Sequence, residues 1–306
     1  RLSRSIECLP EQVLVTGNYA ASMRLLLRTL AQPGQHMWME DPGFPLIRPV
    51  ITGEGVVIDP VPVDEEGMDV AWAQRHYPDA HLRFSLPRTR VRWGLRCRWP
   101  DAGSCWHGRP GATPGLLKMI TIANFGYRGK PLPPLKSLDA PQRVIYAGTF
   151  SKSLFPALRA AWLVVPLPQV AAFRQQAEWM SCSVPTLWQQ TLADFIHEGH
   201  FWRHLKKMRT CYAQRRQWLE SALLAQGFSV VPQLGGIQLV IAVNGDDRAL
   251  ALKARQAGLS VQALSDWRIQ SRGEGGLLVS FTNLTSMAMA TEAVRQLKVA
   301  LFSADK

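Results

Sequence analysis

The sequence predicts an α/β protein with a mainly parallel sheet, followed by a smaller α+β unit at the C-terminal end. Short apolar runs alternate with helical patterns on short turns over residues 11–80, and a second such stretch begins at Arg143. After Pro166 long helical patterns dominate. The 306 residues suffice for a sizeable core. We expect a large domain over residues 1–175 and a small domain over residues 176–306.

The elements of the first half follow from periodicity and from breakers. Apolar residues at helical spacing, among them Met23, Leu26 and Leu30, predict an amphipathic helix. Pro33-Gly34 ends it. The predicted elements are a strand at 13–15, a helix at 19–30, a strand at 36–39, a helix at 46–51 and a strand at 56–58.

The second half begins with two apolar strands that flank a polar turn, and continues with long helices. The predicted strands are 144–146, 161–165, 228–231, 237–241 and 277–281, and the predicted helical stretches are 169–226, 249–256 and 288–301. The stretch from 83 to 125 has three Trp and many Arg, and its apolar residues follow neither the helical nor the strand period. A compact domain rarely needs so long an irregular segment, so this window is aberrant.

Composition and residue spacing argue against several classes of protein. No apolar run reaches the roughly 18 residues of a membrane span. The 5 Cys lack metal-ligand spacing, which indicates a reducing cytoplasm and no metal site. The net charge of +12 would favour a polyanionic partner, but residues 83–125 alone contribute +7 of it, so the excess is local. Because the chain starts at Arg1 and not at Met, we expect a fragment.

The string GTFSK at 148–152, with Arg159 seven residues after Lys152, carries the most chemical information. A lysine on a turn between two strands, flanked by hydroxyls, suits pyridoxal phosphate. Its amine forms a Schiff base with the aldehyde, while hydroxyls and a guanidinium hold the phosphate. A surface lysine in a polar turn is the structural alternative.

This string and others resemble the aminotransferase-like domain of MocR-type regulators in the GntR superfamily, which is a fold-type I pyridoxal-phosphate domain. The resembling strings are EQVLVTG at 11–17, EDPGFP at 40–45, PVDEEG at 62–67, RGKPLP at 128–133, GTFSK at 148–152 and ADFIHEGHF at 193–201. The resemblance covers nearly the whole chain outside the aberrant window. It implies a fold-type I large domain and a small C-terminal domain.

The resemblance assigns roles by position. Lys152 would be the Schiff-base lysine. Thr149, Ser151 and Arg159 would hold the phosphate, and the turn Gly17-Asn18-Tyr19 would present backbone N–H groups to it at a helix N-terminus. Phe44 would stack on the pyridine ring. No substrate-binding residue is assignable: we interpret Arg268 and Arg272 as solvated surface charges, and Tyr127 and Tyr146 as structural.

The family's aspartate that pairs with the pyridine nitrogen is missing. Counting back from Lys152 puts it at Met119, and puts the family's tyrosine at Thr121. We hypothesise that residues of about 85–125 are translated out of frame. Where the genetic code leaves no choice, the shifted Trp93/Gly94 junction gives Gly and the shifted Met119/Ile120 junction gives Asp. Both residues match family motif positions.

Three functions follow as hypotheses. The first is a truncated and impaired effector domain of a MocR-type regulator, which binds pyridoxal phosphate and a small amino compound. The family implies a homodimer, and DNA contact only through an N-terminal helix-turn-helix absent from this chain. The alternative is a class I/II aminotransferase in which Lys152 moves a proton, with catalysis weak or absent here. The weakest is a basic nucleic-acid-binding module centred on residues 83–109.

Overall fold

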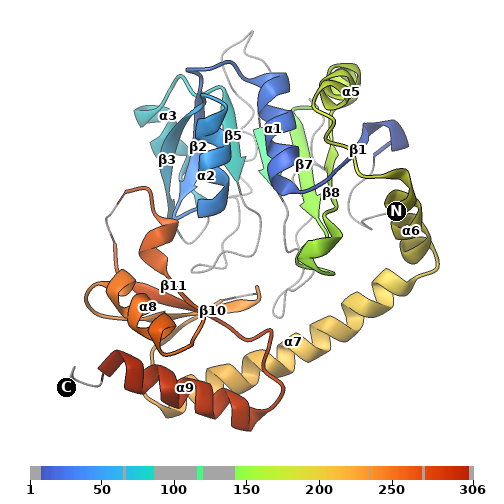
Figure 1. Cartoon of the computed structure of the whole chain (residues 1–306). Helices are drawn as coiled ribbons and strands as arrows, with labels where there is room; N and C mark the ends of the chain where they lie inside the picture. Colours follow the sequence, from blue (N-terminus) through green and yellow to red (C-terminus); the bar gives the residue numbers. More distant parts are fainter. Residues whose placement is uncertain are drawn as a thin grey trace. The chain divides into compact units, whose positions relative to one another are not determined.

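The computed structural model describes residues 8–64, 67–85, 116–119, 142–233, 235–270 and 273–302. They form two compact units, one up to residue 203 and one from residue 204 (Figure 1). Helices α5 and α6 thus group with the first unit. The domain boundary expected after residue 175 stays a prediction.

The first unit is built on an eight-stranded sheet with the order β1-β8-β7-β6-β5-β2-β3-β4. Its strands are β1 (Val13–Thr16), β2 (His36–Asp41), β3 (Val57–Asp64), β4 (Gly67–Met68), β5 (Leu82–Ser85), β6 (Leu116–Met119), β7 (Val144–Thr149) and β8 (Ala161–Val164). Strands β7, β6, β5, β2 and β3 pair in parallel, whereas β8 is antiparallel to both β7 and β1. The predicted α/β class with a mainly parallel sheet is confirmed.

The aberrant window contributes more to this sheet than the sequence predicts. The predicted elements include no strand within the window, yet β6 at Leu116–Met119 pairs between β5 and β7. The first residue of the window, Arg83, lies in β5 and is only 8% exposed. Its guanidinium carbon lies 4.2 Å from the centre of the Trp38 ring, so a cation–π contact accompanies the burial of this charge.

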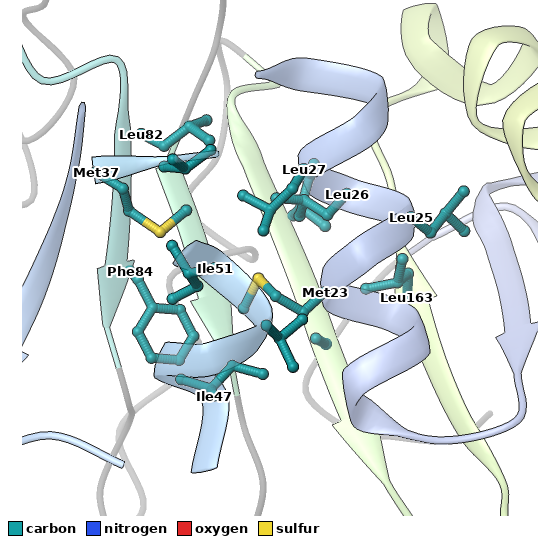
Figure 2. Packing of buried hydrophobic residues seen from close by; sticks show 14 of the residues in the cluster. Met23, Leu25, Leu26, Leu27, Met37, Ile47, Ile51, Leu82, Phe84 and Leu163 are labelled. Carbon is teal, nitrogen blue, oxygen red and sulfur yellow. The ribbon is translucent and has the colours of Figure 1, made fainter. Parts of the chain in front are cut away.

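Helices α1 (Tyr19–Leu30) and α2 (Arg48–Gly53) lie across one face of the sheet (Figure 1). Figure 2 shows Met23 of α1 reaching toward Ile47 and Ile51, within the cluster that also buries residues of β2, β5 and β8. The unit also contains α3 (Val70–His76), α5 (Val170–Trp179) and α6 (Thr186–His197). The apolar stripe that predicted α1 is thus the stripe that faces the sheet.

The second unit is the smaller α+β unit that the sequence predicts. Its elements are the greater part of α7 (His200–Ala225), then β9 (Val230–Val231), β10 (Gln238–Ala242), α8 (Asp247–Gln256), β11 (Val261–Ala263), β12 (Gly276–Ser280) and α9 (Met287–Phe302). The four strands form an antiparallel sheet in the order β11-β12-β10-β9. The buried Asp247 side chain of α8 accepts hydrogen bonds from the backbone N–H groups of Ser265 and Gly276, with N···Oδ2 distances of 3.0 Å in both cases. These bonds tie the helix to the sheet. Within the described ranges, no helix combines the length and apolar character of a membrane span.

Candidate functional site

Several loops of the first unit meet at one edge of its sheet. Strands β1, β2, β6 and β7 run in the same direction, so their carboxyl ends lie at this edge. Thr16, Ala161 and Thr149 form one row of register partners across β1, β8 and β7. Because neighbouring strands lie about 4.8 Å apart, Thr16 and Thr149 are separated by roughly 10 Å. This edge is where open α/β sheets bind ligands.

The turn after β7 presents the candidate lysine. The Thr149 hydroxyl accepts the Ser151 N–H at 3.1 Å and lies 2.9 Å from the Ser151 hydroxyl. It also donates to the Ala160 carbonyl at 3.4 Å, which ties the turn to the segment before β8. Lys152 follows this turn and is exposed. The two hydroxyls and the amine therefore occupy one short, locally braced segment.

The turn Gly17-Asn18-Tyr19 lies between β1 and α1. The Asn18 side chain caps the helix by accepting the Ala21 N–H at 2.9 Å. The Thr16 and Ser22 hydroxyls lie 2.6 Å apart, which holds the strand end against the first helical turn. The Gly17 N–H donates to the Cys182 carbonyl at 3.1 Å, a link that no local sequence pattern indicates. With its positive dipole end at the sheet edge, α1 is suited to receive an anion.

Arg159 lies at the same edge, because β8 is antiparallel to its neighbours and Arg159 precedes its first residue, Ala161, by two positions. Its backbone is left-handed, with φ 52° and ψ 44°, and the residue is exposed. This conformation costs a non-glycine residue about 1–2 kcal/mol. Strained backbone of this kind clusters at functional positions, which makes Arg159 a candidate for a ligand contact.

Phe44 follows β2 and is half-buried beside Tyr19. Their ring centroids are 6.5 Å apart with an interplanar angle of 59°. The preceding Gly43 is sterically required, because a Cβ there would lie 2.2 Å from the Glu40 carbonyl oxygen. The Tyr19 hydroxyl is buried without a hydrogen-bond partner among the described residues. Burial raises the pKa of Tyr19 well above its usual value, so the phenol is neutral.

A further feature that sequence analysis missed is the contact between Gly148 and Trp162. A Cβ on Gly148 would lie 2.3 Å from the Trp162 ring, so the ring packs directly against the glycine backbone. Trp162 also stacks on Tyr146 with centroids 5.1 Å apart. Tyr146 is only 5% exposed. Its expected structural role agrees with this packing.

Other predicted residues lie away from this arrangement or outside the described ranges. Arg268, interpreted above as a solvated charge, is 8% exposed and donates to the Glu274 carbonyl in its own unit. That interpretation was wrong, because the guanidinium braces a loop. Thr121, Tyr127, the string at 128–133 and Arg272 lie outside the described residues.

Met119 is the position where the family's aspartate would stand. It ends β6 and its backbone is in register with Ala147 of β7. Counting along the sequence therefore leads to the carboxyl end of a central strand, at the same edge as the lysine turn. Among the residues that the structure describes, no group of three or more potential metal ligands comes together.

Known proteins resemble this chain in both sequence and fold. The family model "Aminotransferase class I and II" matches residues 123–296. The chain is 30% identical over 99% of its length to the probable rhizopine catabolism regulatory protein MocR of Rhizobium meliloti, and covers 62% of that protein. It is 31% identical over 85% of its length to the HTH-type transcriptional regulator TauR of Rhodobacter capsulatus, and covers 54% of it. The predicted resemblance to MocR-type regulators is confirmed.

A solved structure of the α-aminoadipate aminotransferase LysN from Thermus thermophilus superimposes with a TM-score of 0.82 at 22% identity, over 95% of this chain and 77% of that one. The predicted fold-type I aminotransferase fold is therefore confirmed. The chain spans less than two thirds of the two regulators. Since the family model matches more than half of its residues, the chain belongs to the aminotransferase class I and II family.

Proposed function

We propose that this chain is the pyridoxal-phosphate-binding effector part of a MocR-type transcriptional regulator. The observation that carries the proposal is the row Thr16–Ala161–Thr149, which gathers a lysine turn, an arginine and a helix N-terminus at one sheet edge. Support also comes from two regulators of about 30% identity and from LysN, whose structure holds an N-(5'-phosphopyridoxyl)-L-leucine ligand.

The donor set at this edge fits pyridoxal phosphate. The turn Gly17-Asn18-Tyr19 lies at the positive end of α1, where the N–H groups of Asn18 and Tyr19 are the candidate donors because the Gly17 N–H is bonded to the Cys182 carbonyl. The Ser151 hydroxyl, which lies 2.9 Å from the Thr149 hydroxyl, adds a donor for a phosphate dianion. Arg159 would complete the phosphate site with charge-assisted hydrogen bonds. Phe44, which follows the sterically required Gly43, would offer its ring to the pyridine face.

When bound, pyridoxal phosphate supplies a reactive aldehyde and an electron-accepting ring. Lys152 would hold the aldehyde carbon covalently through its ε-amine, and its exposure leaves the amine accessible to an incoming amino compound. The same amine is the group able to move a proton at the substrate α-carbon.

The sequence at the end of β6 favours a sensor over an efficient enzyme. Met119 carries no charge where the family has the aspartate that keeps the ring nitrogen protonated. Without that proton the ring accepts electrons poorly, so the amino compound would bind without rapid turnover. The alternative function, an aminotransferase, requires the turnover that this substitution opposes.

The effector, the assembly and the cellular location follow from the same resemblance to MocR-type regulators. We propose a small amino compound as the effector, a homodimer as the assembled form and the cytoplasm as the location. DNA would be recognised through a helix-turn-helix segment of the kind that the names of the relatives describe. Ligand-dependent change in the dimer would then alter DNA binding.

Absorbance titration with pyridoxal phosphate tests the site. We expect a weak band near the visible edge that disappears in Lys152→Ala and persists in Lys298→Ala, which removes an exposed lysine from α9. A band that survives Lys152→Ala would show that the lysine is misassigned.

Transamination assays separate the two functions. The chain should convert amino donors very slowly, and Met119→Asp should accelerate this while Met119→Asn should not. Rapid turnover by the unmodified chain would favour the aminotransferase.

Sequencing the coding DNA across codons 83–126 tests whether the copy is damaged. A shifted frame that encodes an Asp-Asp-Tyr segment would support a frameshift. Stop codons in that frame would make the window a genuine departure from the family.

A further inference from the structure

The long helix α7 has a strongly one-sided charge composition. Over His200–Ala225 the helix contains six Lys and Arg residues and one acidic residue, Glu220, which lies 3.7 Å from the Arg216 guanidinium. The aberrant window at 83–125 is therefore not the only basic segment of this chain. Unlike that window, α7 is a described helix, so its charges have defined positions along the helix surface.

Two of these six residues hold α7 in place within the second unit. Arg215 donates to the Thr282 carbonyl, beyond the end of β12. Arg216 is 7% exposed and donates to the Gln233 carbonyl at 2.7 Å. These guanidinium groups act as structural braces, and the helix they brace cannot turn its other side chains inward without breaking both contacts.

The opposite face of α7 is exposed and polar. At 100° per residue, Lys206, Lys207, Gln214 and Gln217 fall within one stripe, and all four are exposed, whereas Leu205, Arg216, Leu219 and Leu223 are buried on the other side. Neither lysine has an ion-pair partner among the residues that the structure describes. From Lys206 to Gln217 the stripe is about 16 Å long at 1.5 Å per residue.

We propose that this stripe of α7, defined as Lys206, Lys207, Gln214 and Gln217, contacts the phosphate backbone of duplex DNA. Lysine and glutamine are side chains that proteins use for phosphate contacts, and such contacts position a protein on DNA without reading sequence. A stripe of about 16 Å matches roughly five phosphates of one strand, which repeat every 3.4 Å along the axis. Duplex DNA is the polyanion that the relatives, as HTH-type regulators, encounter.

This contact would add to the DNA binding of a regulator and does not depend on pyridoxal phosphate. The sequence led us to expect DNA contact only through a helix-turn-helix segment. The stripe provides a second, sequence-independent contact from the aminotransferase-like part, which would raise the effective concentration of the partner segment on the duplex.

The test is fluorescence anisotropy of a labelled duplex with the whole 306-residue chain over a range of salt concentrations. The double variant Lys206→Gln/Lys207→Gln should bind on the order of tenfold more weakly for every duplex sequence. The slope of log K against log salt should shrink by about 1.8, because each lost phosphate contact removes about 0.9. The double variant Lys253→Gln/Lys298→Gln removes the same charge from α8 and α9 and should bind like the parent.

Three outcomes would overturn the proposal. Equal weakening by both double variants would mean that net charge alone governs binding. Loss of binding only in Arg88→Gln/Arg90→Gln/Arg92→Gln would assign the duplex to the aberrant window instead. An equal loss for polyglutamate and duplex DNA would identify a general polyanion surface. Circular dichroism of each variant checks that the exposed substitutions leave the fold intact.

Discussion

Replacing Arg159 by glycine tests two properties of this residue independently: the strain in its left-handed backbone and the proposed contact of its side chain with a phosphate group. The left-handed backbone costs an arginine about 1–2 kcal/mol, and glycine adopts it without that cost. Glycine also makes the unfolded chain more flexible, and this lowers the free energy of unfolding by about 0.5–1 kcal/mol. Because the arginine is exposed, little else is lost, so Arg159→Gly should leave the cofactor-free protein as stable or up to about 1.5 kcal/mol more stable.

Cofactor binding should respond in the opposite direction. A hydrogen bond from a guanidinium to a phosphate contributes about 1.5–3 kcal/mol, so its loss should weaken pyridoxal phosphate binding roughly 10- to 100-fold. Urea unfolding without cofactor measures the first effect, and absorbance titration measures the second. Arg159→Ala is the matched control, since it loses the same contact but keeps the strain.

Two results would refute this reasoning. If Arg159→Gly were more than about 1 kcal/mol less stable than the parent, the arginine would serve the fold and not a ligand. If it bound pyridoxal phosphate like the parent, the phosphate site would lie elsewhere.

Three further substitutions test individual features. Gly148→Ala should lower the free energy of unfolding by about 1–3 kcal/mol, because the new methyl group overlaps the Trp162 ring; chemical denaturation measures this, and an unchanged midpoint would contradict the close contact. Tyr19→Phe should raise the unfolding free energy of the cofactor-free protein by about 1 kcal/mol, since the buried hydroxyl has no partner among the described residues; a loss of stability would reveal an interaction of that hydroxyl. The pKa of Glu292 is lowered to about 2 by hydrogen bonds from Arg295 and Gln296, so its stabilisation is present above about pH 4.5 and disappears as the pH falls toward 2. The melting temperatures of Glu292→Gln and the parent should therefore converge over that range, and a constant difference would exclude the linkage.

Strong local patterns predicted the fold best. The helix at 19–30 was predicted with the bounds of α1, because apolar residues repeat at helical spacing and Pro33-Gly34 follows. The strands around Val13, His36 and Val144 were equally visible as short apolar runs bounded by turns.

Elements stabilised by distant contacts escaped prediction. Strand β5 contains Arg83, whose burial depends on the Trp38 ring of β2, a contact that no local pattern reveals. The short helix α3 escaped prediction for a different reason: it has only seven residues, too few for a clear periodic pattern, although the Asp69 side chain caps it locally by accepting the Trp72 N–H at 2.8 Å. Arg268 was misjudged because a charged residue in a loop gives no sign in the sequence that its guanidinium binds a backbone carbonyl.

The site divides along similar lines. The lysine turn and the helix N-terminus were identified from strings that resemble a family, and the structure places both at one edge. Two features of the site involve segments that are distant in the sequence, so only the folded chain reveals them. They are the hydrogen bond from Gly17 to Cys182 and the packing of the Trp162 ring against Gly148. The roles of the candidate residues stay predictions until a ligand is bound.

The row Thr16–Ala161–Thr149 also determines when the site forms during synthesis. Among the strands that the structure describes, β1 pairs with β8 alone, and the residues of β8 follow it by almost 150 positions. Such long-range pairing raises contact order and slows folding, because the intervening loop must close before its contacts stabilise it. Strand β1 therefore cannot pair with β8 until most of the first unit has emerged from the ribosome. The proposed anion site at α1 would therefore be completed only after the candidate lysine, Lys152, has been synthesised.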